Sequence, residues 1–123
     1  MTVSRRFTII CLVALLSIAG CTGTEPKFGD VEYRDGEFAV TVSSGVLIEH
    51  AGLQVAIAYL EPLGQRQVFS EAQYVNITAG INRFVYPVTL SPGDYRCYLH
   101  LHKGDERLAA VIQELTVPRG DRA

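Results

Sequence analysis

Apolar residues alternate with polar residues at a period of two through most of this chain, and no other feature of the sequence constrains the fold as strongly. In the segment 37–44, EFAVTVSS, the residues Phe38, Val40 and Val42 share one face. Such alternation is typical of a β-strand with one buried face. The closest approach to a helical pattern, GVLIEHAG at 45–52, is too short and too rich in glycine and β-branched residues. The sequence therefore predicts an all-β protein.

Further strands are expected where apolar alternation lies between turn signals such as SPGD at 91–94 and KGDE at 103–106. These strands cover the segments 53–60, 66–77, 82–90, 95–102 and 107–117. The segment 53–60 is apolar on both faces, which predicts a central strand. About seven short strands favour a single β-sandwich domain over residues 31–118.

Three of the expected strands carry an irregular position. The segment 66–77 is weakly amphipathic, so it either contains a bulge or divides into two strands. Pro87 lacks the amide hydrogen that a ladder requires, so we expect the strand 82–90 to lie at a sheet edge or to have its proline nitrogen facing solvent. Gln113 and Glu114 interrupt the apolar pattern of the last strand and predict a bulge there.

Tyr95 stands two residues before Cys97 at the start of an expected strand, directly after the turn SPGD. This spacing resembles the tyrosine corner of immunoglobulin-like domains, in which the phenol bonds back to the backbone of the preceding turn. The resemblance implies this structural role for Tyr95 and implies that Cys97, Leu99 and Leu101 point into the core. The chain has no tryptophan and the segment 53–60 has no second cysteine, so the disulfide of antibody domains cannot form. What remains resembles the disulfide-free, immunoglobulin-like or fibronectin-like sandwiches common in exported bacterial proteins, with a transthyretin-like topology as a near alternative.

The first 21 residues predict where the protein is located. Two arginines precede an apolar run at 7–16, and the motif IAGC at 18–21 closes it. This is the pattern of a secretory signal peptide, since the run is too short for a membrane-spanning helix. The motif resembles the lipobox of bacterial lipoproteins, a family in which the cysteine is acylated and becomes the first residue of the mature chain. The resemblance implies a signal peptide at 1–20 and lipidation at Cys21, with ordinary signal cleavage and an uncleaved anchor as alternatives.

The segments that flank the expected domain are polar. Residues 21–30 are expected to form a flexible, lipidated tether, because glycine, threonine and proline interrupt any apolar periodicity. Thr22 stands where an aspartate would resemble an inner-membrane retention signal, so we expect the outer membrane, on its periplasmic side. Residues 119–123 are expected to be a polar tail.

Cys97 is the one cysteine expected to remain a free thiol. Cys11 lies in the signal peptide, and Cys21 would carry the lipid. An internal disulfide is then impossible in the mature chain. An unpaired cysteine in an exported chain is either buried or used in a bond between chains. Because Cys97 shares its strand face with Leu99 and Leu101, we expect its side chain to be buried.

The charge pattern argues against a nucleic-acid partner. Without residues 1–20, nine basic and thirteen acidic residues give a formal charge of −4. The basic residues stand singly among acidic ones and form no tract.

His100 and His102 are the candidate metal ligands. They stand two residues apart on one expected strand, so both rings leave the face opposite to Cys97. This spacing can hold zinc or copper where further ligands converge. The residues that could supply them are His50, Glu49, Glu114, Asp105 and Glu106. Tyr98 lies on the same face and equally favours a flat, partly aromatic surface for a partner.

The sequence contains no catalytic constellation. Cys97 faces the predicted core, away from both histidines of its strand, and no serine lies in an elbow motif such as G-x-S-x-G. No glycine-rich loop for a phosphate group occurs either. We therefore predict no enzyme activity and no cofactor.

Together these features favour a non-catalytic protein-binding or envelope-assembly module, held at the membrane by lipid. Its partner would be another protein of the cell envelope, and its exposed edge strands could accept a further strand. One alternative is a metal-handling lipoprotein that uses His100 and His102. Another is a purely structural lipoprotein.

Overall fold

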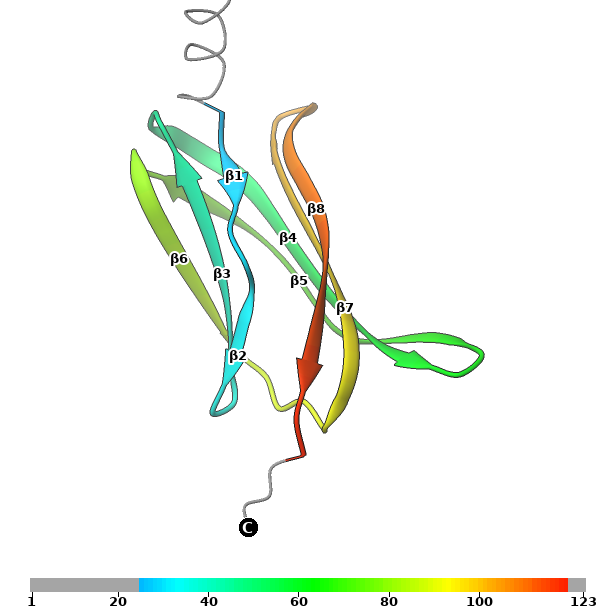
Figure 1. Cartoon of the computed structure of the whole chain (residues 1–123). Coiled ribbons are helices and arrows are strands. Elements are labelled where there is room, and N and C mark those ends of the chain that lie inside the picture. The colour runs from blue at the N-terminus through cyan, green and yellow to red at the C-terminus, as the bar shows by residue number, and fades with distance from the viewer. Residues whose placement is uncertain (1–24, 120–123) are drawn as a thin grey trace, which may run out of the picture.

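The computed structural model describes residues 25–119, which form eight strands in two antiparallel sheets that pack face to face (Figure 1). The prediction of an all-β sandwich is confirmed. None of the described residues belongs to a helix that could span a bilayer. The signal peptide at 1–20 and the lipidated Cys21 lie outside the described residues.

The smaller sheet is built around β3. Its strands are β1 (Lys27–Phe28), β2 (Glu32–Arg34), β3 (Glu37–Ser44) and β6 (Gly80–Pro87). Both β1 and β2 pair with one side of β3, so together they act as a single strand that is interrupted between Phe28 and Glu32. The other side of β3 pairs with β6 over its whole length. Because β6 has no second neighbour, the prediction that Pro87 belongs to an edge strand is confirmed.

The larger sheet has the order β5-β4-β7-β8. Its strands are β4 (Ile48–Glu61), β5 (Gly64–Ile77), β7 (Gly93–Lys103) and β8 (Glu106–Val117). The segment 53–60 lies in β4, between β5 and β7, so the prediction of a central strand is confirmed. With β1 and β2 counted as one interrupted strand, the sandwich has three strand positions facing four. This arrangement agrees with the expected sandwich of about seven strands.

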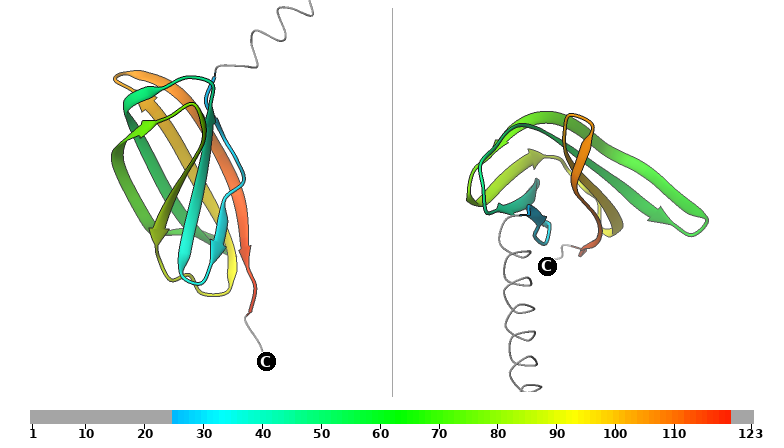
Figure 2. Two further views of the ribbon diagram at one scale, coloured as in Figure 1. Left: turned by 90° about the vertical axis from the view of Figure 1, so that its left-hand side faces the viewer. Right: turned by 90° about the horizontal axis from the view of Figure 1, so that it is seen from above.

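The core lies between the two sheets and is built from the inward face of each strand. Phe38 and Val40 of β3, Leu53 and Ile57 of β4 and Leu101 of β7 are fully buried. In each strand these residues alternate with residues whose side chains face away from the core, as the period of two requires. Seen from above in Figure 2, the larger sheet curves around the smaller one.

The long strands of the larger sheet contain bulges. The register of β4 and β5 shifts between Ile57 and Ala58, where Val68 is the extra residue of β5. The segment 66–77 is therefore one strand with a bulge. A second shift near the start of β4 leaves Glu49 and His50 opposite Asn76.

The bulge predicted at Gln113 and Glu114 is wrong, because both residues keep a regular register with β7. The irregularity of β8 lies at Leu108 instead. Gln113 points inward at the gap between β1 and β2, where its side chain donates to the carbonyl of Gly29 (2.7 Å) and accepts from the amide of Val31 (2.9 Å). A polar residue is tolerated there because it satisfies backbone groups that the interrupted strand leaves unpaired.

The prediction of a flexible tether over 21–30 is wrong for its last residues. Lys27 and Phe28 pair with Ser43 and Val42, and the amide of Gly29 donates to the carbonyl of Thr41 at 2.8 Å. The free edge of β3 supplies hydrogen-bond partners that the sequence of this segment does not reveal. The ordered domain thus begins four residues closer to Cys21 than the predicted boundary at residue 31. At the other end of the chain, β8 ends at Val117 on the far side of the sandwich (Figure 1).

Candidate functional site

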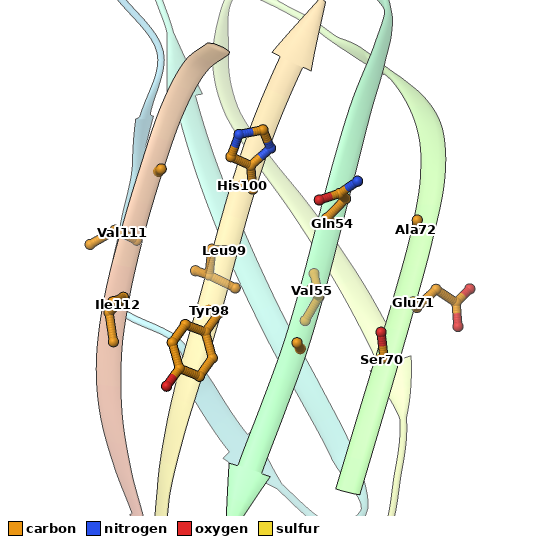
Figure 3. Close-up of a pocket in the computed structure, with 12 residues that line it drawn as sticks. Gln54, Val55, Ser70, Glu71, Ala72, Tyr98, Leu99, His100, Val111 and Ile112 are labelled. Atoms are coloured by element: carbon orange, nitrogen blue, oxygen red, sulfur yellow. The ribbon is translucent and has the colours of Figure 1, made fainter. Parts of the chain in front are cut away.

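The outer face of the larger sheet carries the candidate site. In β7 the alternation sends Cys97, Leu99 and Leu101 into the core. Tyr98 and His100 therefore project from the opposite face, where the lining of an open hollow is drawn in Figure 3. The histidine and tyrosine candidates identified in the sequence thus share one surface.

The hollow has a volume of about 700 Å³ and crosses all four strands of the larger sheet. The outward residues that line it are Gln54, Ala56, Ser70, Ala72, Tyr98, His100, Ala110 and Ile112. Pairing explains its shape, because Ala56 lies between Ser70 and Tyr98, and Ala110 lies next to His100. Small side chains on neighbouring strands leave the sheet surface uncovered between the larger ones.

The larger side chains around the hollow combine apolar and hydrogen-bonding groups. Ile112 is 60% exposed, although it is an aliphatic residue in the middle of a strand. The hydroxyl of Tyr98 and the side-chain amide of Gln65 lie within hydrogen-bonding distance, at 2.9 and 3.1 Å. This contact fixes the position of the Tyr98 ring beside the hollow. A partner would therefore meet an apolar floor with oriented polar groups at its side.

His100 has an unusual environment for an outward-facing histidine. Its Nδ1 atom is buried and has no hydrogen-bond partner among the described residues. Loss of hydration lowers the pKa of the imidazole below its ordinary value of 6.5, and the nearby His102 and Arg107 add to this effect. The ring is therefore held in its neutral form at neutral pH.

His102 lies beside His100, with 5.5 Å between the ring centroids. Its Nδ1 atom is 3.2 Å from the carbonyl oxygen of Gly104. The rest of the ring covers Gly52 on β4, where a Cβ atom would collide with Nε2. Gly52 is thus needed for the close approach of this ring to the sheet.

The additional ligands that a metal site would need do not join this pair. Within residues 25–119, no three side chains of histidine, cysteine, aspartate or glutamate come together in a way that could hold a metal ion. His50 instead stacks on Tyr74 with 4.2 Å between centroids, in a backbone conformation with φ of 56°. Glu114 is engaged by Arg96 at 3.3 Å.

The two structural candidates, Tyr95 and Cys97, face inward on β7. The buried Tyr95 donates a hydrogen bond of 2.6 Å from its hydroxyl to the carbonyl of Ser91, in the turn that precedes the strand. Cys97 is fully buried, and loss of hydration raises the pKa of its thiol to about 11. Little thiolate forms at neutral pH, so this cysteine is a packing residue in its present surroundings. The candidate lipidation site, Cys21, lies outside the described residues.

The floor of the hollow was missed in the sequence analysis. Its signal is a set of small residues at outward strand positions, namely Ala56, Ser70, Ala72 and Ala110. Single small residues on a strand are unremarkable, and these four come together only through the register of all four strands of the larger sheet. Strand register cannot be obtained from the alternation pattern alone.

No protein-family model and no curated protein sequence matches this chain. Among solved structures, the C-terminal domain of Wzt has 16% sequence identity and a TM-score of 0.47, over 69% of this chain and 60% of that one. A family 76 glycoside hydrolase from a bovine Bacteroides thetaiotaomicron strain has 15% identity and a TM-score of 0.45, over 76% of this chain and 20% of the hydrolase. The E. coli curli protein CsgC has 9% identity and a TM-score of 0.40, over 74% and 96%. Similarities this distant carry no information about function.

Proposed function

We propose that this protein is a lipid-anchored, non-catalytic binding module of the cell envelope, and that it presents the outer face of the larger sheet to a protein partner. The observation that carries the proposal is the open hollow of about 700 Å³ on that face. Alanine and isoleucine side chains contribute apolar surface to its lining, and a partner that fills the hollow would remove that surface from solvent. The exposed Ile112 and the oriented Tyr98 hydroxyl lie beside it, which is the mixture of groups found in protein interfaces.

The sequence supplies the anchor in this proposal. The lipobox-like motif that ends at Cys21 would place the domain at a membrane, and we propose the periplasmic side of the outer membrane. The chemistry of the described thiol supports a non-catalytic role, because Cys97 is buried and its pKa is raised to about 11. Its neighbours His100 and Tyr98 leave the opposite face of the strand, so neither can act as its base.

Photo-crosslinking in living cells tests the docking face. A photoreactive phenylalanine analogue placed at Ala72 or Ala110, both exposed in the hollow, should yield a discrete adduct with one envelope protein. The matched control is the same analogue at Arg83, which is exposed on the smaller sheet and should yield no such adduct. Equal crosslinking from both sheets would overturn the assignment of this face.

A charge placed in the hollow provides the complementary test. Ala110→Arg should abolish the adduct from Ala72 without unfolding the domain, because position 110 is exposed. Circular dichroism of the purified variant checks the fold. Persistence of the adduct at wild-type yield would show that the hollow is not where the partner binds.

The second candidate function is metal handling, favoured by the adjacent rings of His100 and His102. Calorimetric titration of the purified domain with zinc and with copper separates it from the first. Binding in the micromolar range that is lost in the double variant His100→Ala/His102→Ala would support metal handling. Absence of binding, or equal binding by the double variant, would exclude this pair as the site.

A further inference from the structure

An apolar cluster occupies the end of the sandwich at which the described chain begins. Val46 and Leu47, in the loop between β3 and β4, are 44% and 57% exposed, and Ile81 at the start of β6 is 78% exposed. These are three of the seven large apolar side chains that are exposed within residues 25–119. We call Val46, Leu47 and Ile81 the apical cluster. No described part of the chain shields it.

The apical cluster lies next to the point where the chain enters the domain. Glu25 and Lys27 line one open groove together with Gly45, Gly80 and Ile81. Register confirms this, because Lys27 and Ile81 pair with opposite sides of the same residue, Ser43. In Figure 1 the start of β1, the end of β3 and the start of β6 all lie at the upper end.

Both loops of the apical cluster are braced by side chains. The hydroxyl of Ser44 donates to the carbonyl of Val46 at 2.8 Å and accepts from its amide at 3.2 Å. In the turn before β6, the side chain of Asn82 bonds the amide and the carbonyl of Thr78, each at 2.9 Å, and also the carbonyl of Val42 at 3.1 Å. The apolar side chains are therefore held outward on defined backbone, so little ordering would accompany their burial.

The short chain between Cys21 and Glu25 limits how far the proposed lipid anchor can lie from the end of the sandwich that carries the apical cluster. Cys21 is four residues before Glu25, and a fully extended chain spans at most about 3.6 Å per residue. The lipid-bearing residue then lies within about 14 Å of Glu25, whatever the conformation of the intervening residues. A bilayer that holds an acylated Cys21 must approach the end of the sandwich that carries the apical cluster.

We infer that the apical cluster inserts into the membrane interface and orients the sandwich on the bilayer, so that the β4–β5 hairpin stays outside it. This inference rests on the proposed lipid anchor. Interfacial elements bury their apolar side chains about 5–10 Å into the boundary between headgroups and acyl chains. Stable attachment commonly combines acyl chains with a second membrane-binding feature, and the cluster supplies one. Lys27 and Glu25 have opposite charges at the same groove, so the contact is apolar in origin and should depend little on salt.

The absence of tryptophan from the sequence makes the test direct, because each introduced tryptophan is the only one present. The variant Leu47→Trp reports on the apical cluster. The matched control is Leu63→Trp, at a fully exposed leucine in the tip of the β4–β5 hairpin, which Figure 1 shows projecting from the side of the sandwich, below the end that carries the apical cluster. Each full-length variant is purified from bacterial membranes. It is then reconstituted into vesicles of phosphatidylethanolamine and phosphatidylglycerol that contain phosphatidylcholine brominated near the top of its acyl chains.

If the apical cluster inserts, the tryptophan of Leu47→Trp should emit at a shorter wavelength than that of Leu63→Trp. Bromine should also quench most of its fluorescence. The emission of Leu63→Trp should match that in vesicles without bromine. Ile81→Trp is a second reporter should the first variant fail to fold, and circular dichroism checks each one.

Three results would overturn the inference. If the protein floats with the vesicles and Leu47→Trp is not quenched, the anchor stands but the apical cluster does not insert. If both tryptophans are quenched, the sandwich lies flat on the bilayer. If the protein does not float with the vesicles at all, the proposed lipid anchor itself fails, and the insertion that rests on it fails too.

Discussion

The two faces of β7 place their side chains in opposite surroundings. Cys97, Leu99 and Leu101 are at most 2% exposed and contact the core, whereas Tyr98 and His100 remain partly exposed beside the hollow. Each inward residue is surrounded by neighbours from both sheets. Each outward residue has neighbours only within its own sheet, and several of these are alanine or serine.

This difference separates stability from recognition along one strand. Close packing makes the inward face sensitive to the loss of even one methylene group. On the outward face, a substitution changes a surface that water already reaches, so its effect should appear in binding. A single strand can therefore be altered on one side without disturbing the other, and the following predictions test how complete that separation is.

The largest effect is expected at Leu101, which is fully buried. Leu101→Ala should lower the free energy of unfolding by about 2–5 kcal/mol, because it removes apolar contacts and leaves a cavity. Urea denaturation of the soluble domain, residues 22–123, measures this loss. Leu63→Ala is the matched control, since that leucine is fully exposed, and should lie within about 0.5 kcal/mol of the wild type. A similar loss from both variants would contradict the assignment of the two environments.

Cys97 should show the next largest effect. Cys97→Ser buries a hydroxyl group at a site that has evolved around a thiol, not around a hydrogen bond. It should lower the free energy of unfolding by about 1–3 kcal/mol in the same denaturation experiment. In the native wild type, the buried thiol with its raised pKa should react with a thiol reagent only as fast as the domain opens. The variant Cys97→Ala/Tyr98→Cys moves the thiol one residue, onto the outward face, and should react rapidly without denaturant. Rapid reaction of wild-type Cys97 would mean that β7 directs this side chain to solvent and not into the core.

The inward face of β7 could be predicted from sequence because burial imposes its own pattern. Alternation at a period of two located Phe38, Leu53 and Leu101 in the core. Pro87 identified an edge strand through its missing amide hydrogen, and the SPGD turn located the start of β7 to within two residues. In each case the information lies within a few neighbouring residues.

The parts that could not be predicted depend on contacts between distant residues. Gln113 appeared to interrupt its strand, yet it satisfies backbone groups of Gly29 and Val31 more than eighty residues earlier in the chain. β1 has only two residues, too few for alternation to be visible, and exists because β3 offers a free edge. The hollow likewise requires Ala72 and Ala110 to be brought onto one face by strand register.

Tyr95 and Tyr98 offer a smaller but sharper contrast, because both phenol groups make a hydrogen bond. Tyr95→Phe keeps the buried ring and removes its bond to the carbonyl of Ser91, which should cost about 1 kcal/mol. Tyr98→Phe removes a bond to the exposed side chain of Gln65, which water can replace, and should be neutral within about 0.5 kcal/mol. Thermal or urea unfolding of both variants decides this. A neutral result for Tyr95→Phe would show that Tyr95 does not act as a corner residue.

The smallest effect is expected from the titration of His100 on the outward face. Its pKa is lowered in the folded state by loss of hydration and by His102 and Arg107, so the neutral ring is favoured by folding. The unfolded state therefore binds the proton more readily, and folding stability should be complete above pH 6.5 and decline as the pH falls below that value. His100→Gln should be neutral within about 0.5 kcal/mol at pH 8 and should remove this part of the decline. The two proteins differ only at position 100, so the difference between the two pH curves isolates His100. A difference in unfolding free energy between the two proteins that grows as the pH rises would contradict this prediction. It would mean that folding stabilises the charged form of His100 beside the hollow.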